Sequence, residues 1–234
     1  MSGKTVVITG SSRGIGRQLA VAYAGLGWRV VATARQLAAL DGIPAAEKYA
    51  LDVADPASVA SFAARLGANT KVHLLINNAG VLSNPKRVED VTKEQLVDAF
   101  QTNSVGPFLV TQALLPNLKL AAAENNSAAG VGAVVVNVSS IQGSIAENSS
   151  GGYYSYRASK SASNSLSKSL AIDLKPFNIS VLQLHPGYVK TDMSPAGIVS
   201  TVDSVDGMSK VIARAFDNAL TGIFYDFQGK ELPW

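Results

Sequence analysis

Short runs of apolar, mostly β-branched residues alternate along the chain with longer stretches in which polar and apolar residues mix at helical spacing. The runs predict six strands and one edge strand, at residues 5–9, 29–33, 48–52, 72–77, 133–139, 179–185 and 222–225. Apolar residues on both faces of a strand are typical of a parallel sheet that helices cover on each side. We therefore expect such a sheet in this chain.

The stretches between the strands predict the covering helices. They lie at residues 14–25, from 55 onward, 92–120 with an interruption near 106–107, 154–174 and about 204–220. The second begins with Asp55 as N-cap and Pro56 at the first helical position. This alternation indicates an α/β fold: one doubly wound Rossmann-type domain over residues 1–234, with residues 121–130 as a surface loop.

Composition excludes several classes of protein and of site. The 234 residues contain no cysteine, which excludes a disulfide framework, a thiolate metal site and a cysteine nucleophile. Only two histidines occur, His73 and His185, so we expect no metal site. No apolar run approaches the roughly 18 residues of a membrane span, and no export signal is visible, so we expect a cytoplasmic protein that contacts no membrane. The net charge of +3 comes from scattered lysines and arginines, which argues against nucleic acid as a partner.

A glycine-rich turn follows the first predicted strand. In a doubly wound sheet the ligand binds at the carboxyl ends of the strands, where the strand order reverses. Residues 9–16 contain Gly10, Gly14 and Gly16 and lead into a helix, with the spacing G-x-x-x-G-x-G rather than the common G-x-G-x-x-G. Glycines let a diphosphate approach the backbone, and a helix N-terminus offers free N–H groups. The turn therefore predicts a dinucleotide cradle, with a simple tight turn as the alternative.

The residues after the next strands bear on which dinucleotide is bound. An acid after the second strand selects NAD, whereas an arginine accommodates the 2′-phosphate of NADP. Here Arg35 follows that strand with no acid beside it, and Arg13 in the glycine turn faces the same place. The two guanidinium groups predict NADP(H), unless they are ordinary surface charges. Asp52 either accepts a hydrogen bond from the adenine amine or shapes a turn, and Asn78-Ala79-Gly80 either admit the cofactor closely or brace the loop.

A tyrosine and a lysine carry the candidate chemistry. Tyr156 and Lys160 lie four residues apart in a predicted helix, so they share one face. A free tyrosine titrates near pH 10, and a nearby ammonium favours the phenolate, so we expect Lys160 to lower the pKa of Tyr156 toward the working range. Ser139 or Ser140, at the end of the fifth strand, could orient a carbonyl oxygen beside the tyrosine. Taken alone, Y-x-x-x-K occurs by chance in many helices.

The whole ordered set of motifs is more specific than any of its parts. It comprises Thr9-Gly10-x-x-x-Gly14-x-Gly16, Asn77-Asn78-Ala79-Gly80, Asn103, Ser140, Tyr156-x-x-x-Lys160 and Pro186-Gly187. In this order and spacing the set resembles the short-chain dehydrogenase/reductases, over nearly the whole chain. Residues 143–144, 151–157, 185–193 and 232–234 look most like those of the sniffer-type carbonyl reductases and the related C-factor proteins.

The resemblance implies a role for each matching residue. Tyr156 would be the general acid, Lys160 would bind the nicotinamide ribose and lower the tyrosine pKa, and Ser140 would hold the substrate oxygen. Asn103 would hold a water molecule in a proton relay. The expected cofactor contacts are Gly10, Ser12, Arg13, Gly14, Ile15, Gly16, Arg35, Asp52, Val53, Asn78, Ala79, Gly80, Tyr156, Lys160, Pro186, Gly187, Val189 and Thr191. The possible substrate walls are Gln142, Ile145, Tyr188 and Trp234, with packing in the core as the alternative for each.

These observations predict an NADPH-dependent reductase of ketones or aldehydes, which acts on a small-molecule carbonyl substrate. Two alternatives stay open: a reductase of 3-oxo intermediates held by acyl carrier protein, and a dinucleotide-binding signalling protein of the C-factor type. The resemblance also implies a homodimer or homotetramer that pairs through the helices at 92–120 and 154–174.

Overall fold

Seven parallel strands form one sheet in the computed structural model, which describes residues 3–82, 87–124 and 130–234. The strands are β1 (Thr5–Ile8), β2 (Arg29–Ala34), β3 (Glu47–Ala50), β4 (Leu74–Asn77), β5 (Ala133–Val138), β6 (Ile179–His185) and β7 (Phe224–Asp226). Their order across the sheet is β3-β2-β1-β4-β5-β6-β7. The order reverses between β1 and β4, which places a ligand site at the carboxyl ends of these strands. The predicted doubly wound fold is confirmed.

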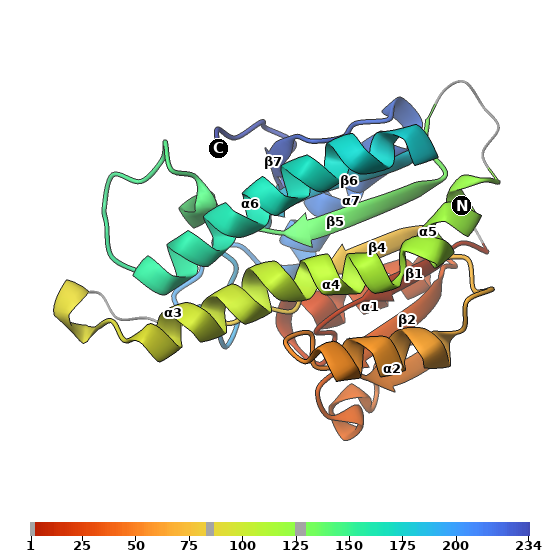
Figure 1. Ribbon diagram of the computed structural model, residues 1–234, viewed down its shortest axis with the longest axis horizontal. Coiled ribbons are helices and arrows are strands. Elements are labelled where there is room, and N and C mark those ends of the chain that lie inside the picture. The colour runs from red at the N-terminus through yellow and green to blue at the C-terminus, as the bar shows by residue number, and fades with distance from the viewer. Residues whose placement is uncertain (1–2, 83–86, 125–129) are drawn as a thin grey trace.

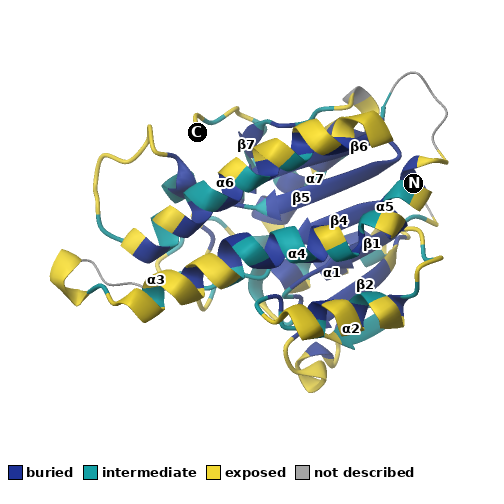
Figure 2. Cartoon of the chain, viewed as in Figure 1, coloured by how far each residue is buried: buried dark blue, intermediate teal, exposed yellow. Residues whose placement is uncertain are grey.

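Helices cover both faces of the sheet (Figure 1). They are α1 (Gly14–Gly25), α2 (Pro56–Leu66), α3 (Lys93–Phe100), α4 (Gly106–Ala113), α5 (Leu115–Ala122), α6 (Tyr154–Leu174) and α7 (Thr201–Asn218). Side chains of α1 and α7 pack in one apolar core, and those of α2, α4, α5 and α6 pack in the other. Figure 2 shows the central strands as almost wholly buried, while the outer faces of the helices are exposed. The edge strand β3 is only partly buried. The near-continuous apolar strands follow from this double cover.

Two predicted helices have different bounds in the structure. The helix expected at 92–120 is divided into α3, α4 and α5, with a π-helical segment at Gln101–Val105 between the first two. The last helix begins at Thr201 instead of residue 204, because the hydroxyl of Ser200 accepts a hydrogen bond from the N–H of Asp203 and so caps the helix. Of the surface loop expected at 121–130, residues 125–129 lie outside the described residues.

Buried amides near the carboxyl ends of β4 and β5 fix where α6 lies over the sheet. Asn77 Nδ2 donates to Asn137 Oδ1 at 2.8 Å, which joins the two strands. Asn137 Nδ2 in turn donates to Ser167 Oγ of α6 at 2.7 Å. A buried amide without such partners costs about 1–3 kcal/mol, so the bonded position of α6 is strongly favoured. The start of this helix is thereby held beside the end of β5.

Candidate active site

A cavity of about 650 Å³ opens at the carboxyl ends of the strands. This volume lies within the range of about 300–1,000 Å³ that is typical of small-molecule sites. All eighteen residues that the sequence predicts as cofactor contacts line the cavity. They come from the segments after β1, β2, β3, β4 and β6 and from the first turns of α6. The fold thus gathers segments that are far apart in the sequence around one space.

The turn between β1 and α1 requires glycine at three of its positions. Gly10 and Gly14 have φ angles of +68° and +54°, in the left-handed region that favours glycine. A Cβ on Gly16 would lie 2.1 Å from the carbonyl oxygen of Gly10. The Asn78 amide donates to the carbonyl oxygens of Thr9 and Gly10, at 3.0 and 3.1 Å, so this side chain braces the turn. The cradle for a diphosphate is therefore built from packed backbone, which leads directly into the N-terminus of α1.

Two arginines line the same cavity as the glycine turn. Arg13 precedes α1 and Arg35 follows β2. Arg13 Nη1 lies 3.1 Å from Asp192 Oδ2, a partner that the sequence analysis did not identify. Asp52 also lines the cavity, but its Oδ1 accepts from the N–H of Ala54 at 3.0 Å, so this carboxylate shapes the turn after β3.

The two serines at the end of β5 have different surroundings. Ser139 Oγ donates to Asn164 Oδ1 of α6 at 2.6 Å, in a buried contact. Ser140 instead shares a hydrogen bond with the Tyr156 hydroxyl, and its Oγ accepts from the N–H of Gln142 at 3.2 Å. The structure therefore places Ser140, and not Ser139, beside the tyrosine.

Tyr156 and Lys160 lie on the first turns of α6, as their spacing predicts. Burial raises the pKa of the Tyr156 hydroxyl, and the hydrogen bond with Ser140 lowers it by less. The expected lowering toward neutral pH is thus wrong for this arrangement, because desolvation of the phenolate dominates. Burial also lowers the pKa of Lys160 to about 8. The Lys160 Nζ donates to the carbonyl oxygen of Val138 at 2.7 Å and lies 5.8 Å from the centre of the Tyr156 ring.

Asn103 is buried in the π-helical segment and is not among the residues that line the cavity. Its Oδ1 accepts from the N–H of Val81, and its Nδ2 donates to the carbonyl oxygen of Val81 and to Ser159 Oγ, at 2.9–3.0 Å. The side chain therefore joins the segment after β4 to α6. Its expected role in a water relay stays a prediction, and these bonds already occupy the amide.

Two of the four candidate substrate-wall residues line the cavity, and the other two do not. Gln142 and Tyr188 line it. Ile145 does not: its side chain is 77% exposed, because the segment between Ser140 and Tyr156 carries it outward. Trp234 is also absent from the lining and stacks on Phe224, with the ring centres 5.8 Å apart. Neither residue is therefore supported as a substrate wall.

Several lining residues were given no individual site role from the sequence. They are Tyr153, His185, Asp192, Met193 and Ser194 among others. His185, Asp192 and Met193 lie within residues 185–193, which resemble the carbonyl reductases, but that resemblance assigns no role to these three side chains. Tyr153, the N-cap of α6, has a φ of +53°, in the left-handed region, and no sequence pattern predicts this conformation for a tyrosine.

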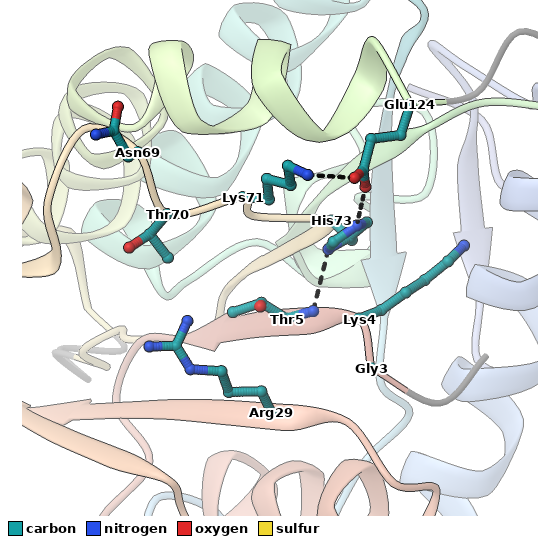
Figure 3. A pocket seen from close by; sticks show the side chains of 9 residues that line it. All are labelled: Gly3, Lys4, Thr5, Arg29, Asn69, Thr70, Lys71, His73 and Glu124. Carbon is teal, nitrogen blue, oxygen red and sulfur yellow. Dashed lines mark hydrogen bonds and ion pairs between the residues drawn. The ribbon is translucent and has the colours of Figure 1, made fainter.

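A second hollow lies at the opposite edge of the sheet, where the strands begin (Figure 3). Glu124 pairs there with both Lys71 and His73, and these two groups lower the pKa of its carboxyl. His73 Nδ1 accepts from the N–H of Thr5 at 3.1 Å. Arg29 pairs with Glu47. Lys4 also lines the hollow, and its Nζ lies 4.5 Å from the centre of the Phe216 ring. The described residues of this hollow include no hydroxyl–ammonium pair comparable to Tyr156 and Lys160, so we assign the chemistry to the other edge.

The described parts of the chain support neither a membrane-spanning helix nor a metal site. None of the described helices is long and apolar enough to cross a membrane. Among the same residues, no cluster of three or more His, Asp or Glu side chains is arranged to hold a metal ion.

Comparison with known proteins agrees with this geometry. Residues 4–198 match the family model of the short chain dehydrogenases. The chain belongs to this oxidoreductase family. A relative is the C-signal protein of Myxococcus xanthus, which is 40% identical over 164 residues, or 70% of this chain and 93% of the relative. The NADP-dependent (R)-specific alcohol dehydrogenase of Lentilactobacillus kefiri is 30% identical over 92% of this chain and 81% of its own.

Two similar solved structures are carbonyl reductases. The carbonyl reductase Sniffer of D. melanogaster has a TM-score of 0.90 and is 32% identical, with 100% of both chains covered. The NADPH-bound carbonyl reductase from chicken fatty liver has a TM-score of 0.88 at the same identity and coverage.

The close packing of Gly16 leads to a prediction about the cradle. We expect Gly16→Ala to lower stability by about 3 kcal/mol, the upper end for overpacked sites, and to abolish dinucleotide binding, because the added Cβ collides with the Gly10 carbonyl. Gly25→Ala is the matched control, since a Cβ at this other end of α1 would meet nothing within 4 Å. Thermal unfolding and fluorescence titration with dinucleotide provide the measurements. Equal binding by both variants would contradict the assignment of the cradle.

Proposed function

We propose that this protein is an NADPH-dependent reductase of ketones or aldehydes. The observation that carries the proposal is the meeting of Ser140, Tyr156 and Lys160 in one cavity with the glycine turn. Carbonyl reductases among the similar structures and an NADP-dependent relative support it. The coarser property, membership of an oxidoreductase family, is established by the family match.

The cavity has the features that NADP requires. A diphosphate needs a turn without Cβ atoms, and the turn at Gly10, Gly14 and Gly16 leaves no space for them on its packed side. A 2′-phosphate needs cations, which Arg13 and Arg35 supply at this end of the cavity. Pro186-Gly187, Val189 and Thr191, in the segment after β6, also line the cavity and are the residues that would contact the nicotinamide. When bound, the reduced nicotinamide supplies the hydride for the carbonyl carbon.

The protein's own residues supply the proton and hold the carbonyl oxygen. Because burial raises its pKa, Tyr156 stays protonated at neutral pH, which is the form that a general acid needs in the direction of reduction. Ser140, hydrogen-bonded to that hydroxyl, is placed to donate to the same carbonyl oxygen. Lys160, whose ammonium lies near the ring, stabilises the phenolate that forms when the proton leaves.

One alternative function has a specific observation in its favour. The similarity to the M. xanthus C-signal protein agrees with a signalling role for a dinucleotide-binding chain. A pure binder has no need of Ser140, Tyr156 and Lys160 in this arrangement, so we favour an enzyme. The acyl-carrier alternative needs a basic docking patch beside the cavity, and it gains no such support. Of the lysines that could contribute to one, Lys119 lies over the Phe177 ring and Lys168 donates to the Gly222 carbonyl. The homo-oligomer and the cytoplasmic location stay predictions.

Removal of the tyrosine hydroxyl tests the chemistry. We expect Tyr156→Phe to lower kcat for carbonyl reduction by about 10²- to 10⁴-fold, the usual contribution of a general acid, while NADPH still binds. Tyr154→Phe is the control, because Tyr154 is an exposed tyrosine on the same helix. NADPH oxidation with a panel of ketones, aldehydes and quinones gives the rates. Full activity of Tyr156→Phe would rule out the mechanism, and a biological effect that survives Tyr156→Phe but not Gly16→Ala would favour signalling.

Charge reversal at Arg35 tests the choice of cofactor. We expect Arg35→Asp to weaken NADPH binding by about 10- to 100-fold, as for the loss of a charge-assisted hydrogen bond, and to affect NADH far less. Titrations with the two reduced dinucleotides provide the comparison. An equal effect on both would defeat the assignment of this arginine to the 2′-phosphate.

The pKa of Lys160 predicts how the rate depends on pH. Its pKa of about 8 means that the ammonium is charged below this pH and neutral above it, whereas Tyr156, with a raised pKa, keeps its proton over the same range. We therefore expect kcat/KM for reduction to fall as pH rises through 8. A profile that stays flat through about pH 9.5 would contradict the role of this charge.

A further inference from the structure

One ion pair joins the two sides of the cavity. Arg13, in the glycine turn, and Asp192, in the segment after β6, both line the cavity and lie 3.1 Å apart. Their side chains are 72% and 73% exposed, so water screens the attraction. Such pairs stabilise a fold only weakly and exchange partners easily.

The fold holds these two segments together without help from the ion pair. A Cβ on Gly14 would lie 3.3 Å from Thr191 Cγ2, so the glycine turn already touches the residue before Asp192. The segment is also held in shape, because the N–H of Ser194 donates to the Thr191 carbonyl at 3.0 Å and the N–H of Lys190 donates to the Val199 carbonyl at 2.9 Å. The backbone of the fold therefore keeps Asp192 close to Arg13 whether or not the ion pair forms.

The two arginines of the cavity differ in whether a carboxylate of the cavity wall already binds them. The lining contains two aspartates, Asp52 and Asp192. Asp52 is bonded to the N–H of Ala54, and Asp192 to Arg13. No carboxylate within the described residues forms an ion pair with Arg35. An incoming phosphate would thus meet Arg35 directly, whereas it has to displace a carboxylate from Arg13.

We propose that Asp192 is a specificity-determining residue that competes with the 2′-phosphate of the cofactor for the guanidinium of Arg13. This inference rests on the proposed use of NADPH. Asp192 engages Nη1 of Arg13. A 2′-phosphate that takes a forked pair of N–H groups from the same guanidinium competes for this donor, and the two anions repel each other when they share one cation. NADH carries no 2′-phosphate and leaves the ion pair intact. Asp192 therefore weakens NADPH binding, and with it the preference for NADPH over NADH.

The test removes the competing charge and keeps the shape of the side chain. We expect Asp192→Asn to tighten NADPH binding about two- to fivefold, the range set by an exposed ion pair, and to leave NADH binding unchanged. Calorimetric titrations of the full chain measure both. Adenosine 2′,5′-bisphosphate should show the same gain and adenosine 5′-monophosphate none, which places the effect at the 2′-phosphate. Unchanged thermal unfolding verifies that the variant is folded.

Two further variants show whether the effect passes through Arg13. In an Arg13→Gln background, Asp192→Asn should give no further gain, because the shared partner is gone. Asp173→Asn removes the same charge from the far end of α6, about 25 Å along the helix from Tyr156 and beyond the screening length at physiological salt, and should change neither affinity.

The outcomes separate this inference from the proposed function. Weaker binding of both dinucleotides to Asp192→Asn would mean that Asp192 positions Arg13 over the diphosphate, and would overturn the competition. Unchanged binding of NADPH, or an equal gain for NADH, would overturn it as well. If the unaltered protein bound no NADPH, the proposed function itself would fail, before any variant is compared.

Discussion

The packing of α6 against the carboxyl end of β5 is the contact on which the candidate site depends. Lys160 donates to the Val138 carbonyl, and Ser139 donates to Asn164, so strand and helix are joined by two short hydrogen bonds. A Cβ on Gly143 would lie 2.8 Å from the Lys160 Cβ, so the turn after the strand fits against the helix only with glycine at this position. Through this contact, Ser140 reaches Tyr156 although 16 residues separate them in the sequence.

The same packing sets the electrostatics of the site. The burial that fixes Tyr156 also makes its phenolate costly, so the hydroxyl keeps its proton. Burial of Lys160 acts in the opposite sense on a cation and brings its pKa to about 8. At neutral pH the Tyr156 hydroxyl is thus protonated, and the Lys160 ammonium beside it has a pKa close to the pH of the solution. Both follow from desolvation, with no need for a neighbouring charge.

The two edges of the sheet use their polar groups differently. Where the strands begin, Lys71 and His73 both bind Glu124, and these contacts join parts of the fold. Where the strands end, the Tyr156 hydroxyl and the two arginines face a cavity. The reversal of strand order between β1 and β4 places the ligand crevice at the second edge. Polar residues are therefore structural at one edge and available to ligands at the other.

The sequence by itself determined the features that depend on neighbours along the chain. Strand and helix order, the glycine turn and the Tyr156–Lys160 spacing all follow from local periodicity, backbone sterics and helix geometry, and the predicted cofactor residues do line one cavity. Family resemblance added Ser140, but the reason it differs from Ser139 lies in Asn164, on a distant helix. Only the tertiary structure decided this difference, the outward position of Ile145, the partners of Asn103 and the pair between Arg13 and Asp192. Each of these depends on burial or on a contact between remote segments, which no local pattern encodes.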